Sequence, residues 1–267
     1  MKLASDPRDW QPFTFRGVAG LATGPPRRLI KVQFLAGLWV AGSLTWFLAT
    51  AWWPVIDAAG EQLPNQAAIR GQRLTWEGPL PVRLAENRFL SVTVDLEGNS
   101  ARASTSDLQL ELLRDGIRFH SLFGHLAVPY PRGYVIQLGR MEFQPWWGAR
   151  RWPLLTVISG AAFAVVLAGW QLQGACYAIW VWIFSFYADR SATVKECWRL
   201  AMAALIPSAV VLGSAVFLYG LHRLNLVGLV CAFAAQVAIA WVYVLIAPFW
   251  LPPRSNTGAR RHNPFRH

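Results

Sequence analysis

The sequence predicts an α-helical integral membrane protein of about five transmembrane helices, with an extracytoplasmic, mainly antiparallel β domain inserted after the first helix. One observation predicts the helices: four long stretches contain no Asp, Glu, Lys or Arg. They are Val32–Ile56, Trp152–Ala188, Leu200–Leu221 and Leu224–Pro253. Each can cross a bilayer, because about 20 apolar residues span its roughly 30 Å hydrocarbon core. A second observation predicts the β domain, because the charged segment between the first two stretches alternates apolar and polar residues.

Composition and charge place the chain in lipid. Of its 267 residues, 54% are hydrophobic and only 15% are charged, whereas about 25% of a soluble domain is charged. The net charge of +11 is concentrated at the ends, with six Lys or Arg in residues 1–31 and four Arg in residues 254–267. Basic ends beside apolar helices are typical of topology signals and of contact with anionic lipids. No nucleic-acid-binding motif accompanies the charge, so nucleic acid is not a predicted partner.

Residues 1–33 are predicted to form a basic cytoplasmic tail, and residues 34–56 the first transmembrane helix. Ala49-Thr50-Ala51 resembles a signal-peptide cleavage site, but the leader is long and the apolar run continues beyond it, so we interpret the helix as an uncleaved anchor. Arg27, Arg28 and Lys31 directly precede the helix, and acidic residues follow it. The positive-inside rule therefore places the N-terminus in the cytoplasm and residues 57–151 on the extracytoplasmic side.

The second apolar stretch is too long for one crossing, since 37 residues of α-helix extend about 55 Å. Two glycines bracket two glutamines at Gly169–Gly174, which predicts a tight turn. We therefore expect a membrane bundle over residues 152–253 that contains four helices. Their predicted ranges are 153–168, 175–187, 198–221 and 225–250.

The number of crossings leaves a conflict at the basic C-terminal tail, residues 254–267. Five crossings place this tail outside, against the positive-inside preference. Four crossings place it in the cytoplasm but leave the long second stretch unexplained. We therefore predict five crossings, because this number accounts for the length of the second apolar stretch.

Residues 57–151 predict a small β domain of about five or six strands. Residues 89–96 alternate, with Leu90, Val92 and Val94 on one face, and residues 108–112 alternate again. Asp115-Gly116 is a hairpin signal before the next strand. The domain contains no cysteine, so neither a disulfide nor a cysteine metal site can form in it. The alternation implies that one face of the sheet is buried.

Two segments carry a resemblance to a known family. Leu112-Leu113-Arg114-Asp115-Gly116-Ile117-Arg118-Phe119 leads into Val128-Pro129-Tyr130, which resembles the insert hairpin of the DUF1189 family of uncharacterised bacterial membrane proteins. Val194–Pro207 has an Arg199-Leu200-Ala201 start and a proline within the helix, and is similar to the Yip1-like superfamily. The resemblance implies a five-helix bundle in the bacterial cytoplasmic (inner) membrane and no known enzymatic activity. It supplies no catalytic or ligand positions.

The sequence contains no nucleophile elbow, P-loop, HExxH or dinucleotide fingerprint. We therefore predict a non-enzymatic protein without a cofactor. His120 and His125 are the histidines of the β domain, and a metal site there needs help from Glu111 or Asp107. Solvent-facing strand positions are the alternative for both histidines, and no metal is predicted.

Two sets of polar residues near the membrane are candidate contacts. Arg190, Lys195 and Arg199 flank the short connector between apolar stretches and are candidate lipid-headgroup contacts. Gln236 lies deepest among the polar side chains of the apolar stretches. It is a candidate intramembrane polar contact, either in an interhelical hydrogen bond or in the lining of a pathway.

The charge-free helices lack the usual equipment of a pump or an ion-coupled carrier. The sequence therefore predicts a partner-binding, scaffold or envelope-sensing membrane protein. Its predicted partners are the lipid bilayer and another envelope protein, which it meets through the β domain. The alternative is a transporter or channel for an uncharged or lipidic substrate, which needs a cavity near Gln236.

Overall fold

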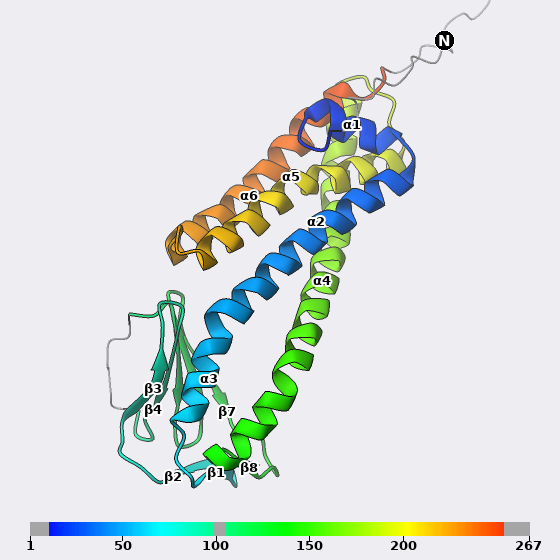
Figure 1. Ribbon diagram of the computed structural model, residues 1–267. Helices are drawn as coiled ribbons and strands as arrows, with labels where there is room; N and C mark the ends of the chain where they lie inside the picture. Colours follow the sequence, from blue (N-terminus) through cyan, green and yellow to red (C-terminus); the bar gives the residue numbers. More distant parts are fainter. Residues whose placement is uncertain (1–10, 99–104, 254–267) are drawn as a thin grey trace, which may run out of the picture. The chain divides into compact units, whose positions relative to one another are not determined.

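The computed structural model describes residues 11–98 and 105–253. These residues form two compact units (Figure 1). Unit 1 contains residues 11–43, 161–219 and 227–253, and unit 2 contains residues 44–98, 105–160 and 220–226. The long helices that begin at Pro26 and Arg140 therefore contribute residues to both units.

Four helical segments of the described residues are long and apolar enough to cross a membrane, which suggests membrane association. The first comprises α2 (Pro26–Phe47), the π-helical segment η1 (Leu48–Trp52) and α3 (Trp53–Glu61). The others are α4 (Arg140–Tyr187), α5 (Val194–Gly220), and α6 (Leu226–Ile246) with the 3₁₀ turn η2 (Ala247–Trp250). The predicted combination of long apolar helices with a β domain is confirmed, but the predicted count of five helices is wrong.

The turn predicted at Gly169–Gly174 does not form, because α4 runs through it without interruption for 48 residues. The separate helices predicted at 153–168 and 175–187 are therefore one helix. Gly174 lies against α5, where a Cβ would collide with Met202 Sδ, so this glycine allows two helices to pack closely. Gln173 donates a hydrogen bond to the hydroxyl of Tyr177 one turn later (2.9 Å), which satisfies a side chain that had suggested a loop.

The length of α4 is shared between the two units. Residues 140–160 belong to unit 2, and residues 161–187 belong to unit 1. At 1.5 Å per residue the second part extends about 40 Å, close to the thickness of a bilayer with its headgroups. The second apolar stretch, which had suggested two helices joined by a turn, is thus one helix. One part of it is long enough to cross a bilayer once, and the other part packs within unit 2.

The core of unit 1 is built on one segment of α5. Eight of its hydrophobic residues are at most 2% exposed: Leu200, Ala201, Met202, Ala203, Ala204, Leu205, Ile206 and Ala209. Residues of α1 (Phe15–Thr23), α2, α4 and α6 belong to the same buried cluster. Four small alanines in this segment let the surrounding helices approach closely, which is how helices associate in lipid.

The N-terminal segment predicted as a basic tail contains an ordered helix. In α1 the side chains of Val18, Leu21 and Ala22 are buried in the core of unit 1. Thr14 caps the helix, because its Oγ1 accepts a hydrogen bond from the Gly17 backbone N–H (3.0 Å). Residues 1–10 of the predicted tail, and the predicted C-terminal tail 254–267, lie outside the described residues.

Unit 2 contains two sheets. The larger has the strand order β3-β4-β5-β6-β7, and the smaller has the order β2-β1-β8. The strands are β1 (Ala67–Arg70), β2 (Arg73–Trp76), β3 (Val82–Glu86), β4 (Leu90–Val94), β5 (Leu108–Leu112), β6 (Gly116–Ser121), β7 (Gly124–Pro129) and β8 (Ile136–Gln137). All neighbours pair antiparallel except β4 and β5, which are parallel. The prediction of a mainly antiparallel domain is confirmed, but its strands form two sheets.

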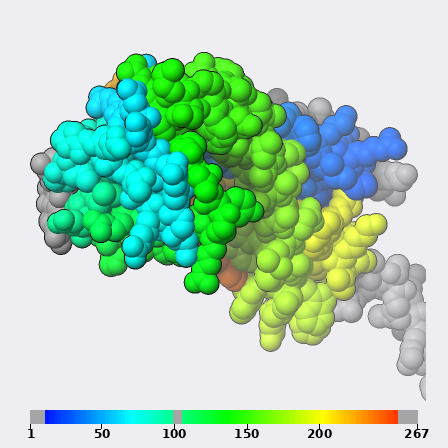
Figure 2. All heavy atoms as spheres, turned by 90° about the horizontal axis from the view of Figure 1, so that it is seen from below, coloured from blue at the N-terminus to red at the C-terminus, as the bar shows by residue number. Residues whose placement is uncertain are grey.

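The start of α4 packs beside α3 in unit 2. Asp57 of α3 accepts a hydrogen bond from Trp147 Nε1 (2.5 Å) and lies 3.4 Å from Arg151 Nη1. The rings of Trp53 and Trp147 pack with centroids 5.4 Å apart. Figure 2 views this end of unit 2, where the green start of α4 lies beside the cyan residues that follow α2. Trp147 therefore fastens α4 to α3.

The close contact at Gly174 gives a test of the continuous helix. We expect Gly174→Val to lower the free energy of unfolding by about 1–3 kcal/mol more than Gly169→Val, because overpacking displaces the buried Met202 side chain. Gly169 is the matched control, since it lies in the same helix and a Cβ there meets no atom within 4 Å. Thermal unfolding of the purified protein in detergent measures the difference. Equal midpoints for the two variants would contradict the packing.

Candidate functional site

The five-stranded sheet of unit 2 has one apolar and one polar face, because residues paired in register share a face. One apolar row crosses from β4 to β7 through Val92, Leu110, Phe119 and Leu126. Val128 ends the neighbouring apolar row. The alternation predicted for these strands is therefore present, and it continues to the edge of the sheet.

The cover over this apolar face decreases from β4 to β7. All five residues of β4 are buried, those of β5 and β6 are mostly half-buried, and all six residues of β7 are exposed. Cover comes from α3, which packs against β3 and β4 with Val55 and Ala59, and from Ile69 and Leu74 of the smaller sheet. At the other end of the face Leu126 is 64% exposed. The apolar surface thus extends beyond the residues that shield it.

The turn between β6 and β7 adds two more exposed apolar side chains. Leu122 is 58% exposed and Phe123 is 78% exposed. Together with Leu126 and Val128 these residues form what we call the uncovered hairpin. Monomeric soluble proteins rarely leave contiguous apolar surface exposed unless it contacts a partner or a membrane.

β7 is also an open edge. Among the described strands it pairs only with β6, so the backbone groups on its outer side have no strand partner. Edge strands usually carry charged side chains or proline, which prevent pairing with another chain. Residues 124–128 contain no Asp, Glu, Lys or Arg, and Pro129 comes only at the last position. The edge is therefore able to accept another strand.

Tyr130 fixes the base of this hairpin. Its hydroxyl donates to the Leu113 backbone oxygen (3.0 Å), and its backbone N–H donates to the Asp115 oxygen (3.2 Å). Gln72 Nε2 donates to the Tyr130 oxygen (2.8 Å). Burial, and secondly the charge of Asp115, raise the pKa of the Tyr130 phenol, so the hydroxyl stays a donor at neutral pH. The uncovered hairpin thus extends from an anchored base.

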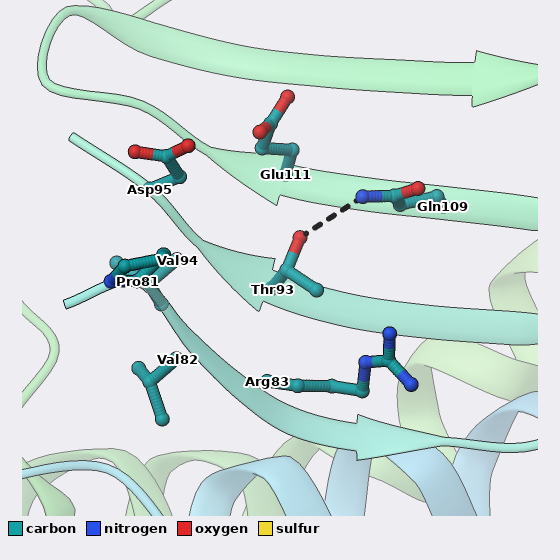
Figure 3. Close-up of a pocket in the computed structure, with 8 residues that line it drawn as sticks. All are labelled: Pro81, Val82, Arg83, Thr93, Val94, Asp95, Gln109 and Glu111. Carbon is teal, nitrogen blue, oxygen red and sulfur yellow. Dashed lines mark hydrogen bonds between the residues drawn. The ribbon is translucent and has the colours of Figure 1, made fainter. Parts of the chain in front are cut away.

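The polar face of the sheet carries a shallow pocket (Figure 3). Its volume of about 10 Å³ leaves room for about one water molecule. The lining residues are Pro81, Val82, Arg83, Thr93, Val94, Asp95, Gln109 and Glu111. Gln109 Nε2 donates to Thr93 Oγ1 across β5 and β4 (3.4 Å), as Figure 3 shows. A pocket of this size does not hold an organic ligand.

Glu111 has two basic neighbours on this polar face. Its buried Oε2 lies 3.4 Å from Arg118 Nη1 and 3.1 Å from His120 Nε2. The rings of His120 and His125, which pair in register, have centroids 5.9 Å apart. Even so, within residues 11–98 and 105–253 no group of three or more His, Cys, Asp or Glu side chains could hold a metal ion. Glu111 therefore serves as the counter-ion of Arg118 and the hydrogen-bond partner of His120.

The three basic residues of the predicted headgroup contact lie in different surroundings. Arg199 is only 8% exposed, and its Nη2 donates to the backbone oxygens of Leu21 (3.2 Å) and Gly24. These oxygens belong to the C-terminal end of α1, where a helix leaves carbonyl groups unpaired. Arg199 therefore ties α1 to α5, and the structure does not bring it to a surface with the other two.

Arg190 and Lys195 line two pockets that adjoin at the end of α4. Arg190 Nη1 donates to the Leu251 oxygen (2.9 Å), and Lys195 is exposed in the first turn of α5. Gln236 is half-buried in α6 and does not line either pocket. The pathway through Gln236 that a transporter needs stays a prediction.

The uncovered hairpin is the feature that the sequence did not reveal. The apolar residues of β7 have the same spacing as those of β4, which are buried. The available signal is the absence of charge in residues 124–128 of an edge strand. That signal becomes readable only when the strand order is known.

Comparison of the chain with protein-family models, with curated proteins and with solved structures finds no match. The resemblance to the DUF1189 family stays a prediction.

The contrast between Arg199 and Arg190 can be tested. We expect Arg199→Gln to lower the free energy of unfolding by about 2–3 kcal/mol, because a buried and a part-buried carbonyl group at the end of α1 lose a charged donor. Arg190→Gln removes the same charge from a half-buried side chain with one hydrogen bond, so we expect a much smaller loss. Thermal unfolding in detergent compares the two. A larger loss for Arg190→Gln would contradict the assignment.

Proposed function

We propose that the protein is a non-enzymatic integral membrane protein whose β domain binds an extended segment of another envelope protein along β7. The observation that carries this proposal is the uncovered hairpin. It presents an uncharged edge strand that is exposed along its whole length and continues an apolar face.

A strand is the occupant that uses both properties of β7. Its backbone edge offers hydrogen bonds, and an added strand would extend the ladder of the five-stranded sheet. The side chains of such a strand alternate, so every second one would lie on the apolar face beside Leu126 and Val128. Full burial of a Leu or Val side chain contributes roughly 1.5–3 kcal/mol, so covering these half-exposed residues favours binding by about 1 kcal/mol each. Backbone pairing would contribute affinity, and the apolar row would fix the alignment of the added strand along β7.

The anchored base of the hairpin supports this proposal. Binding costs less when the receiving edge is already ordered, since fewer torsions are immobilised. The hydrogen bonds of Tyr130 and the complete pairing of β6 with β7 hold the edge in the conformation that another strand needs.

We infer that four crossings place both termini in the cytoplasm. One end of unit 1 gathers α1, the connector after α4 and the end of the last helix. Tyr243 donates to the Phe13 oxygen (2.5 Å), and Ser191 N donates to the Pro252 oxygen (3.2 Å). This arrangement brings the basic N-terminal segment and the point where the basic tail begins to the same end, which agrees with the positive-inside rule. The β domain then faces the extracytoplasmic side of the inner membrane.

Site-specific photo-crosslinking tests the binding edge in the full-length protein within its native membrane. With a photoreactive residue at Val128 we expect one protein adduct of defined mass. With the same group at Arg83, on the opposite edge strand, we expect none. Leu126→Lys should reduce the Val128 adduct about tenfold, because a charge on the apolar row opposes burial of a partner strand.

His125→Lys is the matched control, since it adds the same charge to the same strand on the polar face. We expect it to leave most of the adduct. An adduct of twice the chain mass would identify a second copy as the partner and overturn the proposed envelope protein. Adducts to lipid alone would show that the hairpin contacts the bilayer. An adduct insensitive to Leu126→Lys would also contradict the proposal.

Cysteine labelling tests the number of crossings. In a background without Cys176, Cys197 and Cys231, we expect a membrane-impermeant maleimide to label Tyr134→Cys of unit 2 in intact cells. We expect Ser255→Cys to be labelled only after the membrane is opened. Labelling of both positions in intact cells would contradict four crossings.

A further inference from the structure

Two pockets adjoin in unit 1, where α4 ends and α5 begins. One has a volume of about 640 Å³ and the other about 680 Å³, within the range of small-molecule sites. Trp182 lines both. The first pocket is lined by polar and apolar groups in similar measure, whereas the second is almost wholly apolar. The pair therefore has the polarity of an amphiphile.

The polar pocket contains buried polar atoms without a partner. Arg190 lines it, and although Nη1 donates to the Leu251 oxygen, Nε is buried with no hydrogen-bond partner. Ser185 also lines it, is 2% exposed, and its Oγ has no partner. Both atoms are covered by the protein itself, so an occupant of the pocket would reach Arg190 through Nη2, which is not among the buried atoms.

Arg190 supplies the positive charge of this pocket. No carboxylate of the described residues lies within ion-pair distance of its guanidinium. A guanidinium binds phosphate through parallel N–H donors, and the N-terminus of α5, which opens on the same pocket, also favours an anion.

Glu196 supplies a negative charge in the same pocket. Its Oε2 accepts hydrogen bonds from the Thr193 backbone N–H (2.8 Å) and Oγ1 (2.9 Å), while Thr193 Oγ1 accepts from the Glu196 N–H (3.3 Å). This capping box uses one carboxylate oxygen and leaves Oε1 able to accept from a ligand. A headgroup with a net negative charge would be repelled here, whereas one that carries both charges matches both side chains.

The second pocket suits a hydrocarbon chain. Lys195 is the only charged residue in its lining, which consists of Ala175, Ala178, Ile179, Trp182, Val194, Lys195, Cys197 and Trp198. Long lysine side chains place their methylene groups along apolar surface and keep the ammonium in water.

We propose that the two pockets together bind one phospholipid of the phosphatidylethanolamine class. The phosphate lies against the Arg190 guanidinium, the ammonium donates to Glu196 Oε1, and an acyl chain occupies the apolar pocket past Trp182. A choline headgroup has no N–H to donate to Glu196, and a glycerol headgroup leaves the lipid with a net negative charge beside this carboxylate.

Native mass spectrometry of the full-length protein tests this site. The protein is taken from nanodiscs that contain equal amounts of phosphatidylethanolamine, phosphatidylglycerol and phosphatidylcholine, and the retained lipids are identified. We expect the wild type to retain one phosphatidylethanolamine in preference to the other two. Arg190→Gln should lower retention of every lipid at this site about tenfold, because the charged donors to phosphate are lost.

Glu196→Gln is the more specific variant, because a glutamine preserves the capping box and removes the charge together with the Oε1 acceptor. We expect it to keep total retention and to abolish the preference for phosphatidylethanolamine over phosphatidylglycerol. Arg223→Gln, an exposed residue of the turn before α6, is the control for lost positive charge. Thermal unfolding confirms that each variant is folded. Retention without headgroup preference in the wild type, or retention unchanged by Arg190→Gln, would overturn the proposal.

Discussion

The packing of unit 1 depends on a segment of α5 that is buried on all sides. Helices in lipid gain little from apolar burial against one another, so they associate by close packing and by hydrogen bonds. Ala201, Ala203, Ala204 and Ala209 of α5 allow the close packing. Gln33 of α2 supplies one of the hydrogen bonds, because its Nε2 donates to the Met202 backbone oxygen (3.3 Å). Because α5 takes the centre, α4 and α6 keep wide exposed faces.

Charge distribution and periodicity predicted the helices and most strands, because both are local properties of the chain. The length of α4 was not predictable in this way. A glycine that breaks a helix and a glycine that admits a neighbouring helix are the same in sequence, and only the presence of Met202 beside Gly174 separates them. Helix α1 was missed for a related reason: it packs against residues that are distant in sequence, and Arg199, which hydrogen-bonds to its end, lies 175 residues after Gly24.

The sequence shows which candidate residues lie close together along the chain, but not which of them the fold leaves exposed. Arg190 and Lys195 flank one connector, and they line adjoining pockets. Arg199 has the same charge and a similar position, yet it is buried and hydrogen-bonds to the backbone of α1. Leu126 and Val92 occupy equivalent apolar positions on their strands. However, α3 covers only the end of the sheet that contains Val92. No pattern within a strand records which part of a sheet a helix covers.

The π-helical segment η1 sets the rotational phase of α3. Pro54 cannot donate a hydrogen bond and would crowd the carbonyl one turn earlier, and the wider turn of Leu48–Trp52 comes directly before it. Such a turn holds one residue more than an α-helical turn, and one residue corresponds to about 100° around the axis. The extra residue therefore offsets the apolar side of α3, which carries Val55 and Ala59, by about 100° from the phase that an uninterrupted α-helix would give it. A shortening of the chain by one residue here would regularise the helix and shift the apolar side of α3 by about 100° relative to the residues before η1.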